Sequence, residues 1–451
     1  MFASYVATMD IPSVSTIGRR VAGGALCWLA LATPALAQPA GTPASGPVLT
    51  LPDALALAAR HSPLYERVEA RFGIARGDVR TAGQWPNPTL EYRRENLGAP
   101  IDPDEFFTAY IPIDVTGRRV QLARATGRAT SRLVAERTVG RQDAALSIAR
   151  AWVAAVQSAE LARLAAAQHE AAVEVARLEA VRADEGVSSE AAARRTRVES
   201  TRLGLARALA EARAVQERAA LATQLGVPAD SLPALPAVAG PTSNPLAEVA
   251  LEAPARALLD ELAALDEPTL LLRAQRDRAE LRAVAFAREE AALRRSVERG
   301  GVLGDWQLQG GSKLTGGFFT GQVGLAVPLP LFNRNAGARE RTAGLVRDAE
   351  AAERATTLAV TGEVHTALVT LRRLEALGAT MTSGTEDAAV IADAARVAYT
   401  EGHISLLELL DALRASADAR ATATQYAADL LLARLTLARA VGAPVLVGDT
   451  P

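Results

Sequence analysis

Few of the residue types that carry out catalysis or bind metals are arranged for such chemistry in this sequence. The four histidines, His61, His169, His365 and His403, are scattered along the chain and form no HExxH pair. The sequence has no GxSxG nucleophile turn, no glycine-rich phosphate loop and no nucleophile with a plausible histidine partner. These observations predict that the protein is not an enzyme and holds no cofactor and no preformed metal site.

One acidic segment near the C-terminus has a spacing that could matter for ions. In SLLELLD, residues 405–411, the carboxylates of Glu408 and Asp411 are three residues apart, so a helix would carry both on one face. Gathered carboxylates favour cations. A structural role is equally open, because Ser405 and Glu408 form a capping-box pattern and Asp411 near a helix N-terminus gains from the macrodipole.

The elements that must carry these residues are long helices. Hydrophobic residues make up 49% of the 451 residues, but only 4% are aromatic and 22% are charged, a composition typical of long helices. No proline occurs from Arg118 to Ala183, and 66 residues at a rise of 1.5 Å give a helix of about 100 Å. The net charge of -2 gives no electrostatic argument for binding nucleic acid.

The sequence after residue 37 resembles one unit written twice, in a register of 216 residues. Landmark residues coincide, among them Pro112 with Pro328, Gly186 with Gly402, and Gly226 with Gly442. We therefore predict a tandem duplication. Its parts would be a first repeat at 38–226, a Pro/Ala-rich linker at 227–268, a second repeat at 269–444 and a C-terminal tail at 445–451.

Each repeat is predicted to run helix, strand, loop, strand, very long helix, turn, helix. In the first repeat, Ser62 and Pro63 begin a helix that ends near Trp85, because prolines follow. A turn at 186–189 follows the long helix, and the corresponding turn of the second repeat is at 401–405. The two shorter helices of a repeat, stacked end to end, would match the long one in length.

Four short segments near prolines are predicted strands: 89–96, 106–113, 303–311 and 321–327. Alternation with period two places apolar residues on one face in both repeats: Leu90, Tyr92, Phe107, Ala109, Ile111, Trp306, Leu308, Val323, Leu325 and Val327. Such a face, with the aromatic residues concentrated nearby, suits contact with lipid. A small soluble sandwich that caps a helical bundle would show the same pattern.

The N-terminal segment predicts export. Arg19 and Arg20 precede an apolar stretch that ends in a small-x-small site, so residues 1–37 form a signal peptide cleaved after Ala37. Cys27, the only cysteine, follows Leu26, which is too large for the usual lipidation pattern.

Four strands cannot close on themselves, and in lipid every edge group must be paired, so copies of the chain must share a barrel. Two copies would give eight strands, whose interior is filled by side chains. Three copies would give 12 strands and leave a lumen.

Four motifs carry a family resemblance: LTLPDALALAARHSP, AGQWPNPTLEY, VGLAVPLPLFNRNAGARE and AYTEGHISLLELLDALRASADAR. In this order, over about residues 49 to 444, they strongly resemble the TolC-type outer-membrane factors. The resemblance implies a mainly α fold with a small β part, and a homotrimer with a 12-stranded β-barrel in outer-membrane lipid. The barrel would continue into a 12-helix periplasmic tunnel that docks on a periplasmic adaptor and an inner-membrane RND-type pump. PNPTLEY and PLPLFNRN look most like the cobalt-zinc-cadmium efflux branch.

The resemblance also implies site residues. In the family, acidic residues at the positions of Glu408 and Asp411 narrow the closed periplasmic mouth, and three copies would set six carboxylates at one level. Ala192 and Arg195 occupy the equivalent first-repeat positions. The turns would contact the adaptor, through Gly186, Val187, Ser188, Gly402, His403 and Ile404, although a purely structural turn explains each glycine equally well.

The predicted function is therefore a passive exit duct for divalent heavy-metal cations. Multidrug efflux and type I protein secretion are alternative cargoes for such a duct. A periplasmic coiled-coil structural or adaptor protein is the alternative of another class, and it predicts helices without membrane strands.

Overall fold

The computed structural model describes residues 48–98, 100–237, 251–300, 306–329 and 331–444. The predicted signal peptide, the C-terminal tail and residues 303–305 of the third predicted strand lie outside them. The first half contains α1 (Leu51–His61), α2 (Pro63–Ala82), β1 (Thr89–Glu95), β2 (Asp104–Ile113), α3 (Arg118–Asp184), α4 (Glu190–Leu225) and the 3-10 turn η1 (Ala229–Ser231). The second half contains α6 (Ala253–Ala264), α7 (Glu267–Asp277), α8 (Ala279–Gly300), β3 (Trp306–Thr315), β4 (Phe318–Ala326), α9 (Ala336–Thr400) and α10 (Leu406–Ala440).

The very long helices are confirmed. α3 has 67 residues and α9 has 65, and neither contains a proline. Each begins directly after a residue with left-handed backbone, Gly117 (φ 68°) and Asn335 (φ 57°). Asp114 stabilises the start of α3, since its Oδ2 accepts the amide of Arg119 at 2.6 Å. At a rise of 1.5 Å per residue, α3 separates β2 from the following turn by about 100 Å.

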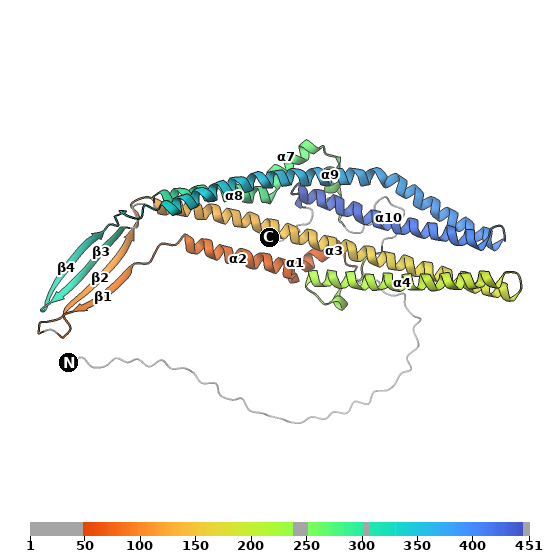
Figure 1. Ribbon diagram of the computed structural model, residues 1–451, viewed down its shortest axis with the longest axis horizontal. Helices are drawn as coiled ribbons and strands as arrows, with labels where there is room; N and C mark the ends of the chain where they lie inside the picture. Colours follow the sequence, from red (N-terminus) through yellow and green to blue (C-terminus); the bar gives the residue numbers. More distant parts are fainter. Residues whose placement is uncertain (1–47, 99, 238–250, 301–305, 330, 445–451) are drawn as a thin grey trace, which may run out of the picture. The chain divides into compact units, whose positions relative to one another are not determined.

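The shorter helices stack as predicted. α2 begins at the end of α4, where the Ser62 Oγ donates to the Gln224 carbonyl oxygen at 2.5 Å. α3 and α4 run side by side, as do α9 and α10 (Figure 1). The helix predicted to reach Trp85 ends at Ala82 instead, because Gly83 takes the C-cap position.

A hydrophobic core surrounds the middle of the long helices. α1, α6 and α7 add apolar faces to α3, α4, α9 and α10, and Trp152 at the centre is fully buried. The Trp152 indole Nε1 donates to the Leu49 carbonyl oxygen at 3.0 Å, so its polar atom is satisfied. Two of these helices were not predicted: α1 precedes Ser62, and α6 lies within the segment predicted as a linker.

The four strands form one antiparallel sheet in the order β1-β2-β3-β4. The second hairpin differs from the prediction. β3 extends to Thr315 rather than 311 and β4 begins at Phe318 rather than 321, because Gly316 and Gly317 (φ 54° and 82°) close a tight turn between them. Among the described residues, no helix is both long enough and apolar enough to cross a membrane.

Candidate functional site

The long helices end in two turns that close helical hairpins. α3 passes through Gly186 (φ 74°) into α4, and α9 passes through Gly402 (φ 79°) into α10. The next residue in each turn donates its amide back to the preceding helix, at 2.9 Å for Val187 and 2.8 Å for His403. Left-handed backbone favours glycine, so the conformation alone accounts for both glycines.

The remaining turn residues offer a mixed surface. Val187 is 67% exposed, and the His403 side chain is also exposed. Ser188 and Ile404 are half-buried. The turns therefore present two glycines, an aliphatic side chain and an imidazole to the surroundings of the chain.

Glu408 caps α10. Its Oε2 accepts the Ser405 amide at 2.7 Å, and the Ser405 Oγ accepts the Glu408 amide at 3.3 Å, which completes a capping box. The backbone and then the side-chain hydrogen bonds of Ser405 lower the pKa of the Glu408 carboxyl. Both Glu408 and Asp411 are exposed on the surface of the single chain. The structural role of Glu408 is thus present, and it leaves the carboxylate charged and accessible.

A buried polar cluster that the sequence did not reveal joins the ends of α3 and α9. The Glu179 side chain is only 3% exposed; it accepts the Tyr399 hydroxyl through Oε1 and the Ser188 hydroxyl, at 2.7 Å, through Oε2. Arg182 lies 3.6 Å from the same carboxylate and 5.2 Å from the Tyr399 ring centroid. Desolvation by burial and the hydrogen bond to Glu179 raise the pKa of Tyr399 to about 12. The cluster fastens the first turn to the second hairpin.

A second cluster joins α4 to α10. The Glu199 carboxylate accepts Arg202 at 2.8 Å and Arg414 at 2.6 Å. The Arg202 hydrogen bond is the largest cause that lowers the pKa of Glu199. Contacts between residues this far apart in sequence follow no local spacing, so only the fold reveals them.

The strand register places the predicted apolar residues on one face of the sheet. Leu90 pairs with Ala109, Tyr92 with Phe107, Ile111 with Leu308, and Leu308 with Leu325. Directly paired residues share a face. Trp306 is half-buried and Val327 lies just beyond β4, whereas Leu90 and Val323 are 75% and 86% exposed. The single chain therefore leaves a broad apolar surface uncovered.

The opposite face of the sheet is polar and internally bonded. The Tyr110 hydroxyl donates to Glu91 at 2.7 Å, and the Gln322 amide donates to the Thr108 hydroxyl at 2.9 Å. The two faces thus differ in chemistry, as alternation with period two predicts.

The histidines do not come together. His365 lies on α9 with its Nδ1 3.0 Å from a Glu267 oxygen, and His403 lies 3.5 Å from Glu401. His169 differs from the predicted surface residue, because it packs against Gly204 of α4 and its Nδ1 is buried. Over the described ranges, no three His, Cys, Asp or Glu side chains gather as metal ligands would.

Comparison with known proteins assigns part of the chain. Residues 269–443 match the family described as outer membrane efflux protein. This part of the chain belongs to that family. It includes α7 to α10, and therefore the second turn, Glu408 and Asp411. A search of curated proteins gives no match.

Solved structures show the same fold over most of the chain. The outer membrane protein VceC from Vibrio cholerae is 17% identical, with a TM-score of 0.70 over 87% of this chain and 96% of that chain. The channel CmeC from Campylobacter jejuni is 15% identical, with a TM-score of 0.70 over 87% and 85%. The open-state channel MtrE from Neisseria gonorrhoeae is 17% identical, with a TM-score of 0.70 over 88% and 89%. The predicted fold class, mainly α with a small β part, is confirmed.

Proposed function

We propose that this chain is the outer-membrane channel of a tripartite efflux system and acts as a passive exit duct. The match of residues 269–443 to outer membrane efflux proteins carries the proposal, and the likeness of the fold to VceC, CmeC and MtrE supports it. In this scheme a periplasmic adaptor and an inner-membrane RND-type pump deliver the substrate. The chain performs no reaction and supplies no energy.

The duct would lie in the outer membrane and extend far into the periplasm. The exposed apolar face of the sheet, with Leu90, Tyr92 and Val323, suits contact with lipid. The turns, about 100 Å along α3 from the sheet, would then lie in the periplasm and meet the adaptor. The six turn residues named above are the proposed contacts, with Val187 the most exposed apolar side chain among them.

The duct would be a homotrimer. β1 and β4 are the two edges of the sheet in one chain, so their outer hydrogen-bonding groups need strands from other copies. Three copies would form a 12-stranded barrel that continues into a 12-helix periplasmic barrel. Apolar side chains left exposed on α4 and α9 would also be covered between copies: Val198, Leu205, Leu209, Val215, Leu358 and Val390.

Native mass measurement in detergent tests the assembly, with an expected mass of three chains. Chemical cross-linking of the same sample should give dimers and trimers and no larger species. A stable monomer that keeps its strands would contradict the trimer.

The chain is also proposed to be a tandem duplication, with repeats at 38–226 and 269–444. Adding 216 to the bounds of α1 gives those of α7, and adding 216 to the first residue of α4 gives that of α10. The elements therefore recur in the register that the glycines and prolines indicated.

Glu408 and Asp411 are the proposed periplasmic gate. Both carboxylates are exposed near the second turn, and threefold symmetry would set six of them around one opening. The double variant Glu408→Gln with Asp411→Asn keeps the side-chain shapes and lets the glutamine cap α10, while it removes the charges. Planar-bilayer recordings should then show weaker cation selectivity and weaker block by trivalent cations.

Ser405→Ala serves as the control, since it removes the cap and keeps both charges. Unchanged selectivity and block in the double variant, with normal trimer yield, would leave these residues only a structural role. Altered selectivity in the control would show that the cap, rather than the charge, sets the gate.

Divalent heavy-metal cations are the proposed cargo, supported by the junction wording PNPTLEY and PLPLFNRN. Loss of the gene should sensitise cells to zinc, cobalt or cadmium more than to drugs. Lost drug tolerance with unchanged metal tolerance would favour multidrug efflux instead, and a secretion defect would favour type I protein export.

A periplasmic coiled-coil protein is the competing function, because the two hairpins of long helices also suit such a role. Cell fractionation separates the two. The proposed duct should sediment with outer membranes and need detergent for extraction, whereas the coiled-coil protein would be released with the periplasm.

A further inference from the structure

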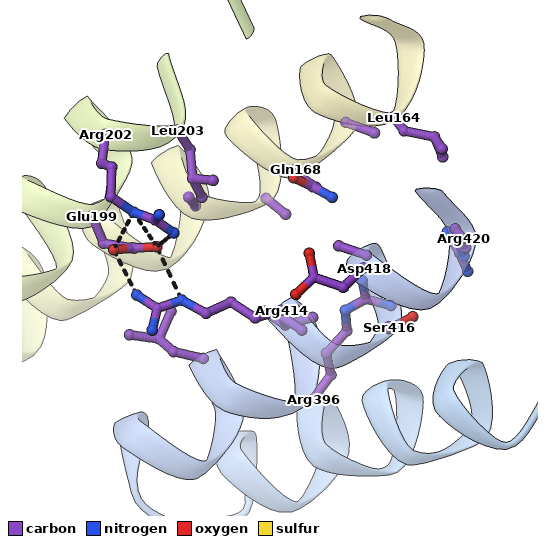
Figure 2. Close-up of a pocket in the computed structure, with 16 residues that line it drawn as sticks. Leu164, Gln168, Glu199, Arg202, Leu203, Arg396, Arg414, Ser416, Asp418 and Arg420 are labelled. Atoms are coloured by element: carbon purple, nitrogen blue, oxygen red, sulfur yellow. Dashed lines mark hydrogen bonds and ion pairs between the residues drawn. The ribbon is translucent and has the colours of Figure 1, made fainter. Parts of the chain in front are cut away.

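A cavity of about 600 Å³ lies where α10 meets α3 and α4, and the proposed duct does not use it. Four helices line it, α3, α4, α9 and α10, so it spans the two helical hairpins (Figure 2). Apolar side chains cover part of its surface, including Leu164, Leu203, Leu410 and Leu413. A space of this size and lining suits a small organic molecule.

The charged residues around the cavity are predominantly arginines. Four arginines line it, Arg202, Arg396, Arg414 and Arg420, against two acids, Glu199 and Asp418. The lining therefore has an excess of two positive charges, which favours an anionic occupant.

Part of this charge is already neutralised within the protein. Glu199 binds Arg202 and Arg414 together, as Figure 2 shows, so two guanidinium groups share one carboxylate. Arg396 binds Asp393 at 2.6 Å.

Two charges stay open toward a ligand. Arg420 forms no ion pair, and the Asp418 carboxylate forms no hydrogen bond or ion pair, with any residue that the structure describes. Asp418, Gln168 and Arg414 are directed toward the same space (Figure 2). An anion would therefore gain from Arg420 and from the two arginines on Glu199, and would be opposed by Asp418.

We propose that this cavity binds a small amphipathic organic anion. The apolar body lies on the leucines, and the acidic group lies toward Arg420 and the Arg202–Arg414 pair. Because one ligand contacts both the α3–α4 and the α9–α10 hairpins, its binding stabilises their present arrangement. The inference concerns the helical hairpins alone and does not depend on the proposed cargo.

Isothermal titration of the purified full-length chain in detergent tests the site, with naphthalene-1-sulfonate as the probe. A titration into detergent alone corrects for partition into micelles. We expect one saturable site per chain, and an affinity for the neutral naphthalene-1-sulfonamide that is about tenfold lower, because it lacks the charge. The absence of saturable binding, or equal affinity for the neutral probe, would overturn the proposal.

Three variants locate the site. Arg420→Gln should weaken sulfonate binding about two- to tenfold, and Asp418→Asn should strengthen it by a similar factor, since each changes one unpaired charge at the cavity. Ala417→Leu, which fills part of the cavity without altering charge, should also weaken binding.

Arg207→Gln is the matched control, because Arg207 lies on α4 outside the cavity and pairs with Glu211. Its affinity should equal that of the parent chain. If the charge variants and this control all bind alike, the probe associates with the helical surface and not with the cavity. Helical circular dichroism establishes that each variant is folded.

Discussion

Two equivalent joints hold the short helices of the repeats together, and they use different chemistry. At the first joint the Ser62 Oγ donates to the Gln224 carbonyl oxygen at 2.5 Å. At the second joint, 216 residues later, the Arg278 Nη1 donates to the Ala440 carbonyl oxygen at 3.0 Å. A helix C-terminal carbonyl needs a donor in both places. The fold therefore sets the requirement, and either a small hydroxyl or a buried guanidinium can meet it.

The arginine brings further partners with it. Its guanidinium also binds Glu280 at 3.0 Å and Glu363 at 2.8 Å, and Glu280 in turn binds Arg439. Arg439 extends the network to Asp143 on α3 at 2.7 Å. The second joint is thus connected to α3 and α9, whereas the first joint is a local contact.

Removal of the buried arginine should show the largest difference between the joints. The Arg278 side chain is only 4% exposed, so Arg278→Met leaves Glu280 and a carbonyl without their donor. We expect a loss of about 3 to 5 kcal/mol in the free energy of unfolding. Guanidinium denaturation followed by helical circular dichroism measures it. Arg276→Met, at an exposed position nearby, should cost less than about 0.5 kcal/mol, and equal losses would refute the assigned role.

The glycines that close the joints should rank next. Gly226 and Gly442 both have left-handed backbone, with φ of 75° and 77°. A Cβ on Gly226 would overlap the His61 carbonyl oxygen, whereas on Gly442 it would lie 2.9 Å from the Asp277 carbonyl carbon. We expect Gly226→Ala to cost about 2 to 5 kcal/mol and Gly442→Ala less.

Thermal unfolding of the two glycine variants gives their order. Gly77→Ala in α2 is the control, because nothing lies within 4 Å of its added Cβ, and it should stabilise the chain by up to about 1 kcal/mol. A larger loss for Gly442→Ala than for Gly226→Ala would reverse the comparison.

The hydroxyl at the first joint should have a smaller effect than the arginine at the second. Ser62→Ala removes the bond to Gln224 and the N-cap of α2, where the Ser62 Oγ accepts the Leu64 amide at 3.2 Å. We expect a loss of about 1 kcal/mol, measured by the same denaturation. Ser62→Thr should restore most of it, and a loss as large as that of Arg278→Met would contradict the contrast.

The smallest effect concerns pH at the two turns. The hydrogen bonds of Ser405 lower the pKa of Glu408, so its capping contribution is present above the ordinary pKa and is lost as pH falls through the lowered value. The first turn has Ala192 at this position, and its cap is the neutral Ser189 hydroxyl.

Hydrogen exchange should therefore show that the Ser405 amide loses protection between about pH 7 and about pH 3. The Ala192 amide should keep its protection over the same range. Parallel loss at both turns would indicate general acid unfolding rather than titration of one cap.

The sequence predicted features that are local or periodic. Gly186, Gly402 and the proline-free run after Arg118 set the helices and turns, since left-handed backbone and helix continuity depend on single residues. The apolar strand face followed from alternation. The Ser405–Glu408 capping box was also visible from its spacing and is present.

Other features depend on packing between distant segments. Glu179 and Tyr399 are 220 residues apart, so no spacing predicts that they bind each other. α6 was missed because the prolines of its surroundings suggested a linker, although one proline occupies its first turn, where proline is tolerated. The Glu199 cluster and the cavity beside it likewise appear only once four helices pack together.

The open edges of the sheet have a consequence for the order of folding. The helices have their own core around Trp152 and can become stable within one chain, because most of their partners lie on the same polypeptide. The strands β1 and β4 have unsatisfied outer ladders until further strands arrive. A newly made chain therefore passes through a period in which its helical part is formed and its sheet is a template for unwanted strand pairing. The length of that period depends on chain concentration, so slow synthesis should favour aggregation at the sheet rather than prevent it.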